Sequence, residues 1–251
     1  MLVTPLRTDV ITPGSHTLEG VLDTAIAELL EGSIVAVSSK IISLCENRVV
    51  PLESTDRDTL IEQESDIYLP ADYSPYGHHF TIARGTLVGS AGVDVSNGAG
   101  TYVLWPANPQ ADANRIRTHL QQRFGLMQLG VIVTDSVSQF LRLGAVGTCL
   151  AYSGFLPVKS YVGESDLFGR KLAVERANVA EGLAAAAVLA MGEGAEQTPV
   201  CILSDLPFVS FNADDPSEDE LESTTVRLQD DLFAPFFLPA PWRKGGRSTR
   251  E

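Results

Sequence analysis

The sequence predicts an α+β fold built around a mixed β-sheet. Short apolar runs with the composition of buried strands occur at three places: 34–37, 131–133 and 199–203. Apolar residues recur at helical spacing in three longer segments: 18–30, 111–124 and 172–191. A period near 3.6 residues is typical of a helix with one buried face, and a short apolar run is typical of a buried strand. Because helices and strands do not alternate strictly along the chain, the order favours α+β over a doubly wound parallel sheet.

The N-terminal part is expected to open with an amphipathic helix. Its apolar face runs from Leu18 to Leu30, Ser15 or Thr17 can cap its start, and Gly32 can end it. The segments expected after it are a buried strand over 34–37, a polar turn over 38–40 and an acidic helix over 53–69.

The middle of the chain is expected to hold more strands. A strand over 81–88 can pair with 102–104 across the glycine-rich stretch between them. Pro109 precedes a second helix, over 111–124, which ends at Gly125. After the strand at 131–133, glycines 144, 147 and 154 favour strands and turns.

The C-terminal part begins with the alanine-rich helix over 172–191 and the strand over 199–203. Six of the nine residues from Asp214 to Glu222 are acidic, and Pro216 suits the first turn of a helix there. The end, from Arg243 to Glu251, is basic and polar, and we expect it to be frayed.

Composition and charge exclude several classes of protein. The chain has 251 residues and is 44% hydrophobic, enough for one large domain or two interlocked ones. A net charge of −14 argues against binding to nucleic acid, which needs a basic surface. No apolar run approaches the roughly 20 residues of a membrane helix, and the N-terminus lacks a signal-peptide layout. The three cysteines have neither metal-site nor disulfide spacing. We therefore expect a cytoplasmic protein that binds no membrane.

Three short motifs carry the chemistry. The runs 90–97 and 131–136 each set one aspartate, Asp94 and Asp135, beside small or hydroxyl residues, and 191–194 sets Glu193 between two glycines. Such places let oxygen ligands and backbone approach a metal and a phosphate together. Each also has a plainer interpretation, because an aspartate after a strand often caps a turn and a Gly-flanked Glu often ends a helix.

Two cations are candidate phosphate ligands. Lys40, in the turn after the first strand, can reach a phosphate as a point charge, although a solvated lysine is the more common case. Arg142 lies between two leucines, which predicts a buried stem and a head directed at an anion, either a phosphate or a structural carboxylate. The pair His78–His79 predicts no zinc site, because neighbours on a strand point to opposite faces.

Taken in order, these motifs resemble those of the coenzyme F-420 gamma-glutamyl ligase family. Ser38–Ser43 with Glu46–Arg48 resembles S-x-K-I-V-S…E-G-R, Ser90–Asn97 resembles N-A-G-V-D-x-S-N, Val131–Ser136 resembles V-I-I-T-D-T, Asp166–Leu172 resembles D-L-F-G-R-E-L, and Met191–Gly194 resembles M-G-E-G. The likeness spans roughly residues 4–205. It implies a ligase-like domain over 1–210, leaving 211–251 as an acidic extension with a basic end.

The resemblance also implies a function and a site. It implies a two-lobed, dimeric α+β enzyme that uses a nucleoside triphosphate, GTP or ATP, to join L-glutamate to a carboxylate. Two Mg²⁺ or Mn²⁺ ions would be bound, one by Asp94 and Asp135 and the other by Ser136 and Glu193. Nucleotide contacts would come from Ser39, Lys40, Asn97, Met191, Gly192, Gly194, Thr198 and the segment from Arg7 to Val10. Lys40 and Arg142 would act on the transferred phosphoryl group.

Departures from the family pattern leave the acceptor open. Gln139 and Leu44 stand where the family has cations, and Ser138 stands where it has glycine. The resemblance implies the F-420 deazaflavin precursor as acceptor. Other runs resemble a divergent branch linked to folate, so folate gamma-glutamylation is the alternative. A metal-dependent phosphohydrolase and a non-catalytic nucleotide-binding module are the rival classes.

Overall fold

The computed structural model describes residues 1–247, and its centre is a five-stranded mixed sheet with the order β1-β12-β2-β8-β9. The strands are β1 (Leu2–Leu6), β12 (Val200–Ser204), β2 (Ser33–Ser38), β8 (Leu129–Ser138) and β9 (Ala145–Ser153). β2 and β8 are parallel, and the other neighbours are antiparallel. The structure is therefore consistent with the predicted α+β class.

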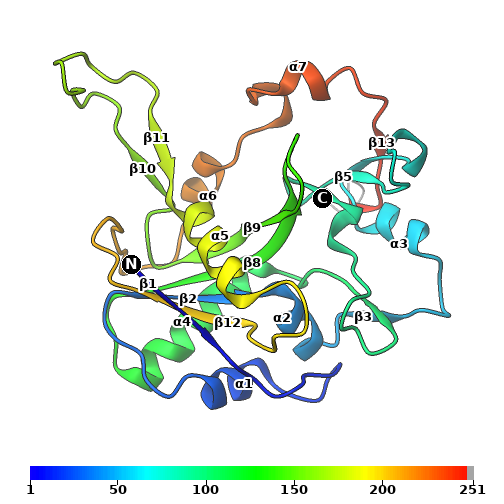
Figure 1. Cartoon of the computed structure of the whole chain (residues 1–251), viewed down its shortest axis with the longest axis horizontal. Helices are drawn as coiled ribbons and strands as arrows, with labels where there is room; N and C mark the ends of the chain where they lie inside the picture. The colour runs from blue at the N-terminus through cyan, green and yellow to red at the C-terminus, as the bar shows by residue number, and fades with distance from the viewer. Residues whose placement is uncertain (248–251) are drawn as a thin grey trace.

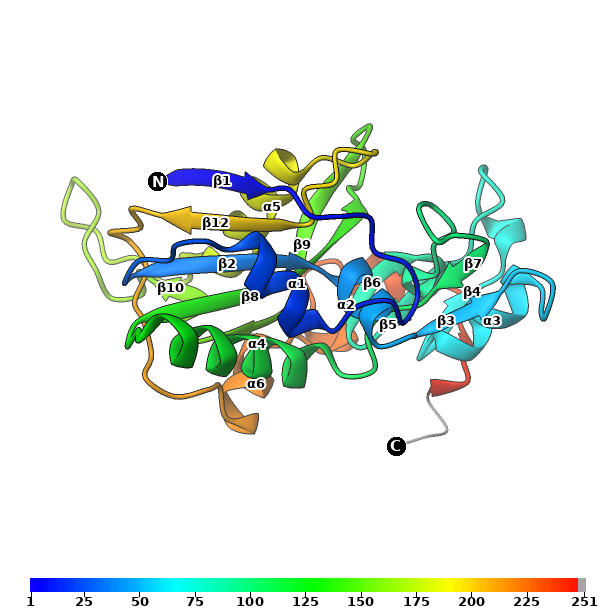
Figure 2. The ribbon, with the colours of Figure 1, turned by 90° about the horizontal axis from the view of Figure 1, so that it is seen from below.

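Helices cover both faces of this sheet. Val35 and Val37 of β2 pack with α1 (Leu18–Ala25), α2 (Ser39–Cys45) and α4 (Pro109–Phe124). Ile34 and Ala36, which alternate with them, pack against α5 (Val179–Met191) on the other face. Figure 2 shows α1 and α4 in front of the strands and α5 behind them. Burial on both faces explains why β2 reads as a continuous apolar run.

Residues 49–106 form a second, smaller region beside the sheet (Figure 2). A four-stranded sheet contains, in order, β13 (Arg243–Lys244), β4 (Ile67–Leu69), β5 (Phe80–Ala83) and β6 (Thr86–Gly89). A ribbon pairs β3 (Val49–Pro51) with β7 (Thr101–Val103), and α3 (Arg57–Glu64) lies beside them. Leu60, Ile61, Val93 and Trp105 belong to the apolar core of this region.

Two further segments extend from the main body. The ribbon β10 (Val158–Ser160) and β11 (Arg176–Asn178) carries a long loop that projects outward (Figure 1). The C-terminal segment contains α6 (Glu218–Thr224) and α7 (Ala234–Phe237). Asp215, ahead of α6, accepts a hydrogen bond from the buried Arg117 at 2.9 Å. No helix within residues 1–247 is long and apolar enough to cross a membrane.

Several sequence predictions about local structure are confirmed. The helix expected over 111–124 is α4, which starts at Pro109. It is ended by Gly125, which adopts a left-handed conformation with φ of 69°. Buried strands are found at 34–37, 131–133 and 200–203, and the glycine-containing stretch after 131–133 holds the strand β9, as expected.

Other predictions about local structure are wrong. The first helix stops at Ala25, since Ile26 is extended, and Leu30 is exposed. The expected turn at 38–40 is the start of α2, and the expected helix over 53–69 is only α3, followed by β4. Pro216 precedes the helix α6, whose N-cap is Ser217.

The expected pairing of 81–88 with 102–104 is also wrong. β5 pairs with β6 inside the segment 80–89, through a tight turn at Arg84–Gly85, whereas β7 pairs with β3. The alanine-rich helix begins only at Val179, because β11 precedes it. The predicted end is not frayed over 243–247, because Arg243 and Lys244 pair with β4 and the backbone N–H groups of 245–247 donate to carbonyls of residues 62–66. Its last four residues, 248–251, lie outside the described residues.

Candidate active site

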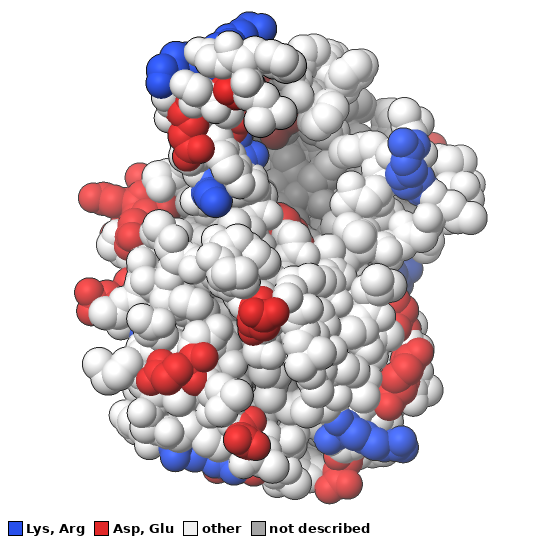
Figure 3. Space-filling model, turned by 60° about the vertical axis from the view of Figure 1, so that its left-hand side comes forward, with Lys and Arg blue, Asp and Glu red and all other residues white. Residues whose placement is uncertain are grey.

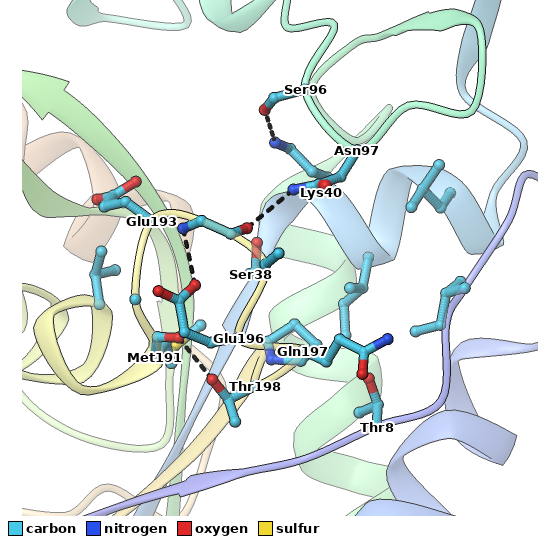
Figure 4. Close-up of a pocket in the computed structure, with 18 of the residues that line it drawn as sticks. Thr8, Ser38, Lys40, Ser96, Asn97, Met191, Glu193, Glu196, Gln197 and Thr198 are labelled. Carbon is cyan, nitrogen blue, oxygen red and sulfur yellow. Dashed lines mark hydrogen bonds between the residues drawn. The ribbon is translucent and has the colours of Figure 1, made fainter.

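A pocket of about 350 Å³ brings the three sequence motifs together. Its walls come from the first turn of α2, the loop 94–97, β8 at 134–136, the loop 191–199 and the segment 8–11 after β1 (Figure 4). Ser38 at the end of β2 is in register with Thr134 of the parallel strand β8. Lys40 and Asp135, which follow these two residues, therefore reach the same edge of the sheet, where ligands of open α/β sheets commonly bind.

Asp94 is held by a dense set of donors. Lys40 Nζ and Ser96 Oγ each lie 2.5 Å from Asp94 Oδ2, and the backbone N–H groups of Val95 and Ser96 donate to Oδ1. Burial by itself would raise the pKa of Asp94. The hydrogen bonds from Lys40 and Ser96 outweigh it and lower the pKa to about 2. Asp94 is therefore a fixed anion at neutral pH.

Asp135 has a different environment. It lies inside β8 rather than after a strand, two residues past a bulge between Val133 and Thr134. The indole N–H of Trp105 donates to its Oδ2, and the backbone N–H of Ser136 donates to Oδ1 at 2.8 Å. Burial raises the pKa of Asp135 to about 6 despite these donors, and the charge of Asp94 adds to the rise. Within residues 1–247, Asp135 has no ion-pair partner.

Lys40 provides the positive charge in the pocket. Its ammonium group contacts Asp94. It also donates to Ser96 Oγ at 2.8 Å, as Figure 4 shows. Acidic side chains are spread over the face shown in Figure 3, in line with the net charge of −14. An anionic substrate therefore depends on local cations and backbone N–H groups. Ser39, the other α2 residue predicted to touch the nucleotide, is buried and does not line the pocket.

The loop after α5 closes one side of the pocket. Ser136 Oγ donates to Glu193 Oε2 at 3.1 Å, so the two residues predicted to share a metal lie in contact. Asn97 Nδ2 donates to the carbonyl of Gly194 at 3.1 Å, and Thr198 Oγ1 donates to that of Met191 at 2.6 Å. Gly192 has a φ of +83°, and a Cβ there would lie 2.4 Å from the carboxyl carbon of Glu196. The predicted loop residues are thus brought together around one opening.

Arg142 is not brought into this site. It lies at the exposed tip of the β8–β9 hairpin, where its guanidinium donates to the carbonyl of Leu141. The neighbouring leucines, Leu141 and Leu143, are 94% and 107% exposed. The prediction of a buried stem is therefore wrong, because the apolar neighbours that suggested it occupy a hairpin tip and not a core.

The candidate ligands fit a magnesium or manganese ion that binds together with phosphates. All four are carboxylate or hydroxyl oxygens, the hard donors that these ions prefer. Within residues 1–247, no three His, Cys, Asp or Glu side chains converge on one point. Mg²⁺ usually takes one or two protein carboxylates and completes its shell with water and substrate phosphates. The unpaired, partly buried carboxylate of Asp135 is the group that a cation would satisfy best.

Two contacts at the pocket were not anticipated from the sequence. Trp105 contacts Asp135, and Gln197 accepts a hydrogen bond from Arg7 at 2.8 Å that ties the N-terminal segment to the pocket loop. Trp105 lies in the run 102–106, one of those that resemble the divergent branch, but that resemblance gives the tryptophan no role, and only the folded structure places it beside Asp135. The positive φ of Gln197, 59°, also has no sequence signal.

Carboxylates, hydroxyls and one lysine thus line a single pocket, and the comparison with known proteins identifies the family. The family model of F420-0:Gamma-glutamyl ligase matches residues 58–205. The chain is 31% identical to the coenzyme F420:L-glutamate ligase of Methanothermobacter thermautotrophicus, over 74% of this chain and 80% of that protein. It is 32% and 34% identical to the proteins of the same name from Methanocaldococcus jannaschii and Methanosarcina barkeri, over 71% and 70% of this chain and 78% and 74% of those proteins.

The chain therefore belongs to the F420-0:gamma-glutamyl ligase family. This confirms the resemblance seen in the motifs and the prediction of an enzyme that forms gamma-glutamyl amide bonds. The matched segment contains Asp94, Asp135 and Glu193, whereas Lys40 lies outside it.

Proposed function

We propose that this protein uses a nucleoside triphosphate, GTP in the first instance, to add L-glutamate to the carboxylate of the F-420 deazaflavin precursor. The observation that carries the proposal is the convergence of Asp94, Asp135, Glu193 and Lys40 on one pocket in a member of this family. The acceptor follows from the names of the relatives, which are coenzyme F420:L-glutamate ligases. The enzyme is proposed to act in the cytoplasm.

The reaction requires activation of the acceptor carboxylate, because oxide is too poor a leaving group for direct attack by an amine. A carboxylate oxygen attacks the γ-phosphorus of the nucleotide, the bond to the bridging oxygen breaks, and nucleoside diphosphate leaves. The glutamate amine then attacks the carbon of the acyl phosphate. Inorganic phosphate leaves, the nitrogen loses a proton, and the amide remains.

The chain's own residues have distinct roles in this scheme. Asp94 and Asp135 would hold one divalent ion, and Ser136 and Glu193 a second. The ions would supply charge neutralisation for the phosphates. Lys40, already bound to Asp94 and Ser96, offers its remaining N–H donor to a phosphate oxygen and offsets charge that develops during transfer. Gly192 and Gly194 let the loop backbone approach the nucleotide closely.

We further propose that the enzyme is a two-lobed homodimer. The five-stranded sheet and the region 49–106 would be the lobes, and the pocket receives residues from both. The projecting loop between β10 and β11 supports a dimer, because Leu167 and Phe168 at its tip are 97% and 95% exposed. Large apolar side chains exposed in this way are typical of an interface. Sedimentation analysis of the wild type and of Phe168→Ser tests this arrangement.

The test of the proposed function is a product assay. Protein is incubated with GTP or ATP, Mg²⁺ or Mn²⁺, L-glutamate and either the deazaflavin precursor or a folate. Nucleoside diphosphate release that depends on both glutamate and the deazaflavin, with a product heavier by one glutamate residue, would support the proposal. Product from folate alone would instead support the folate alternative. Diphosphate release without any amide product would indicate a phosphohydrolase, and no release would indicate a non-catalytic module.

A further inference from the structure

Trp105 contacts a residue of the pocket from the buried core of the region 49–106. Its side chain is 4% exposed, belongs to the apolar core of the region 49–106 and does not line the pocket. Its indole N–H nevertheless donates to Oδ2 of Asp135, which does line the pocket and belongs to β8 of the large sheet. This contact joins the two regions of the chain directly beneath the pocket.

The backbone around Gly92 is shaped to receive this ring. Ser90, Ala91 and Gly92 have consecutive positive φ angles of 57°, 51° and 71°, a left-handed conformation that is unfavourable for an L-residue other than glycine. A Cβ at Gly92 would lie 2.2 Å from Trp105 Nε1 and 2.3 Å from Cε2. The position therefore requires glycine both for its φ and for the space that the indole takes.

The same turn is fixed by buried hydrogen bonds. Thr81 Oγ1 donates to the carbonyl of Val88 at 2.6 Å and accepts from the N–H of Ala91 at 2.8 Å. The N–H of Ser90 donates to the carbonyl of His79 at 3.0 Å. A strained segment that is held in this way is commonly found at functional sites, where the surrounding structure maintains it.

We infer that Trp105 is a positioning residue that holds the Asp135 carboxylate in its metal-binding orientation, and that Gly92 leaves the space that the indole ring occupies. This inference rests on the proposed metal-dependent function of the pocket. Asp135 receives one donor on each oxygen, from Trp105 and from the Ser136 backbone. Loss of the indole donor leaves the Ser136 N–H as the one donor that orients the carboxyl group, whose terminal torsion is only weakly constrained by itself. Partners that orient a metal ligand typically change metal affinity by about 10–100-fold.

The chain offers a matched pair of tryptophans for the test. The indole N–H of Trp242 donates to the carbonyl of Phe237 at 2.8 Å, away from the pocket. Trp105→Phe and Trp242→Phe each keep an aromatic ring and remove one N–H. Mn²⁺ binding to the full chain without nucleotide is measured from the spin-resonance signal of free Mn²⁺, and thermal unfolding is measured without metal.

We expect Trp105→Phe to weaken Mn²⁺ binding about tenfold or more, and Trp242→Phe to bind Mn²⁺ like the wild type. Gly92→Ala should reproduce the loss. Equal Mn²⁺ affinity in Trp105→Phe and the wild type would overturn the inference, and so would a wild type that binds no Mn²⁺. Glutamate ligation by the same samples is scored separately, so failure of the ligase function is distinguishable.

A second readout follows the contact itself in metal-free protein. The two indole N–H signals in a ¹⁵N-labelled sample are assigned from the two tryptophan variants. Asp135→Asn should shift the Trp105 signal and leave that of Trp242 in place. An unmoved Trp105 signal would show that the indole does not contact Asp135 and would overturn the inference even if the fold is intact.

Discussion

The two aspartates of the pocket have similar sequence contexts but opposite electrostatic environments. Asp94 lies in a loop of the smaller region, where the hydrogen bonds from Lys40 and Ser96 outweigh burial and lower its pKa to about 2. Asp135 lies in a strand of the large sheet, where burial raises its pKa to about 6. The fold therefore stabilises the ionised form of Asp94 with its own donors, whereas the ionised form of Asp135 is destabilised by burial. A carboxylate whose pKa is shifted in this way is typical of functional positions.

The largest effect is expected for Asp135→Asn. The variant should lose turnover by at least about 100-fold, because a neutral amide is a poor ligand for a hard cation. Without metal it should be more stable than the wild type by about 1 kcal/mol at pH 8, because no ionised carboxyl is buried. The gain is limited because asparagine has only one acceptor oxygen for the two donors.

The pH dependence of that gain has a definite sign. The folded pKa of Asp135 lies above its unfolded value, so the native state binds more protons between about pH 4 and pH 6. Wild-type stability therefore falls as the pH rises through this window, and the advantage of Asp135→Asn grows and then levels off. Urea unfolding of both proteins at pH 4, 6 and 8 measures it, and a difference that stays constant across these values would contradict the account.

Asp94→Asn should show the reverse dependence of stability on pH. Because its pKa is lowered, Asp94 contributes stability that is present above about pH 4 and lost as the pH falls toward 2. The variant should be less stable than the wild type at pH 7 by about 1 kcal/mol or less, since the pair is partly exposed and screened. If Asp94→Asn were more stable than the wild type at pH 7, the two aspartates would not have opposite effects on stability, which would contradict the comparison.

Lys40→Ala should separate nucleotide binding from folding. A charge-assisted hydrogen bond to phosphate contributes about 1.5–3 kcal/mol, so nucleotide affinity should fall roughly tenfold or more. The melting temperature should change little for such a partly exposed pair. Lys159→Ala, on the β10–β11 ribbon, is the control and should leave nucleotide affinity unchanged. Calorimetric titration with GTP measures both, and equal affinities would reduce Lys40 to a structural partner of Asp94.

The smallest effect is expected for Arg142→Ala. The guanidinium is exposed at the β8–β9 tip and outside the pocket. Turnover and the KM for nucleotide should both stay within about twofold of the wild type, as is usual for exposed positions. A loss of tenfold or more would show that the hairpin tip reaches the phosphates during catalysis.

The sequence predicted the parts of the fold that depend on local pattern. Pro109 and Gly125 bound α4 as expected, and the apolar runs at 34–37 and 131–133 are buried strands. Strand pairing was not predictable, because 81–88 could pair with any neighbouring strand until the turn at Arg84–Gly85 is known. The prediction of a buried Arg142 stem was wrong because flanking leucines do not distinguish a core from a hairpin tip.

The candidate site was predictable where its residues lie in motifs. Asp94, Asp135, Ser136 and Glu193 were chosen from three short runs, and the structure places all of them on one pocket. Whether they hold metals stays a prediction. Trp105 was beyond prediction, because its contact with Asp135 joins positions thirty residues apart and depends on the packing of two regions.

Activation of the acceptor carboxylate by phosphorylation can be tested by following the carboxylate oxygen. The deazaflavin precursor is labelled with ¹⁸O in its carboxylate and incubated with GTP, Mn²⁺, L-glutamate and enzyme, and the released phosphate is analysed by mass spectrometry. We expect one ¹⁸O atom in the phosphate for each amide formed, and neither product with Asp135→Asn. Amide formation with unlabelled phosphate would contradict the account, because the carboxylate oxygen would then not have attacked phosphorus.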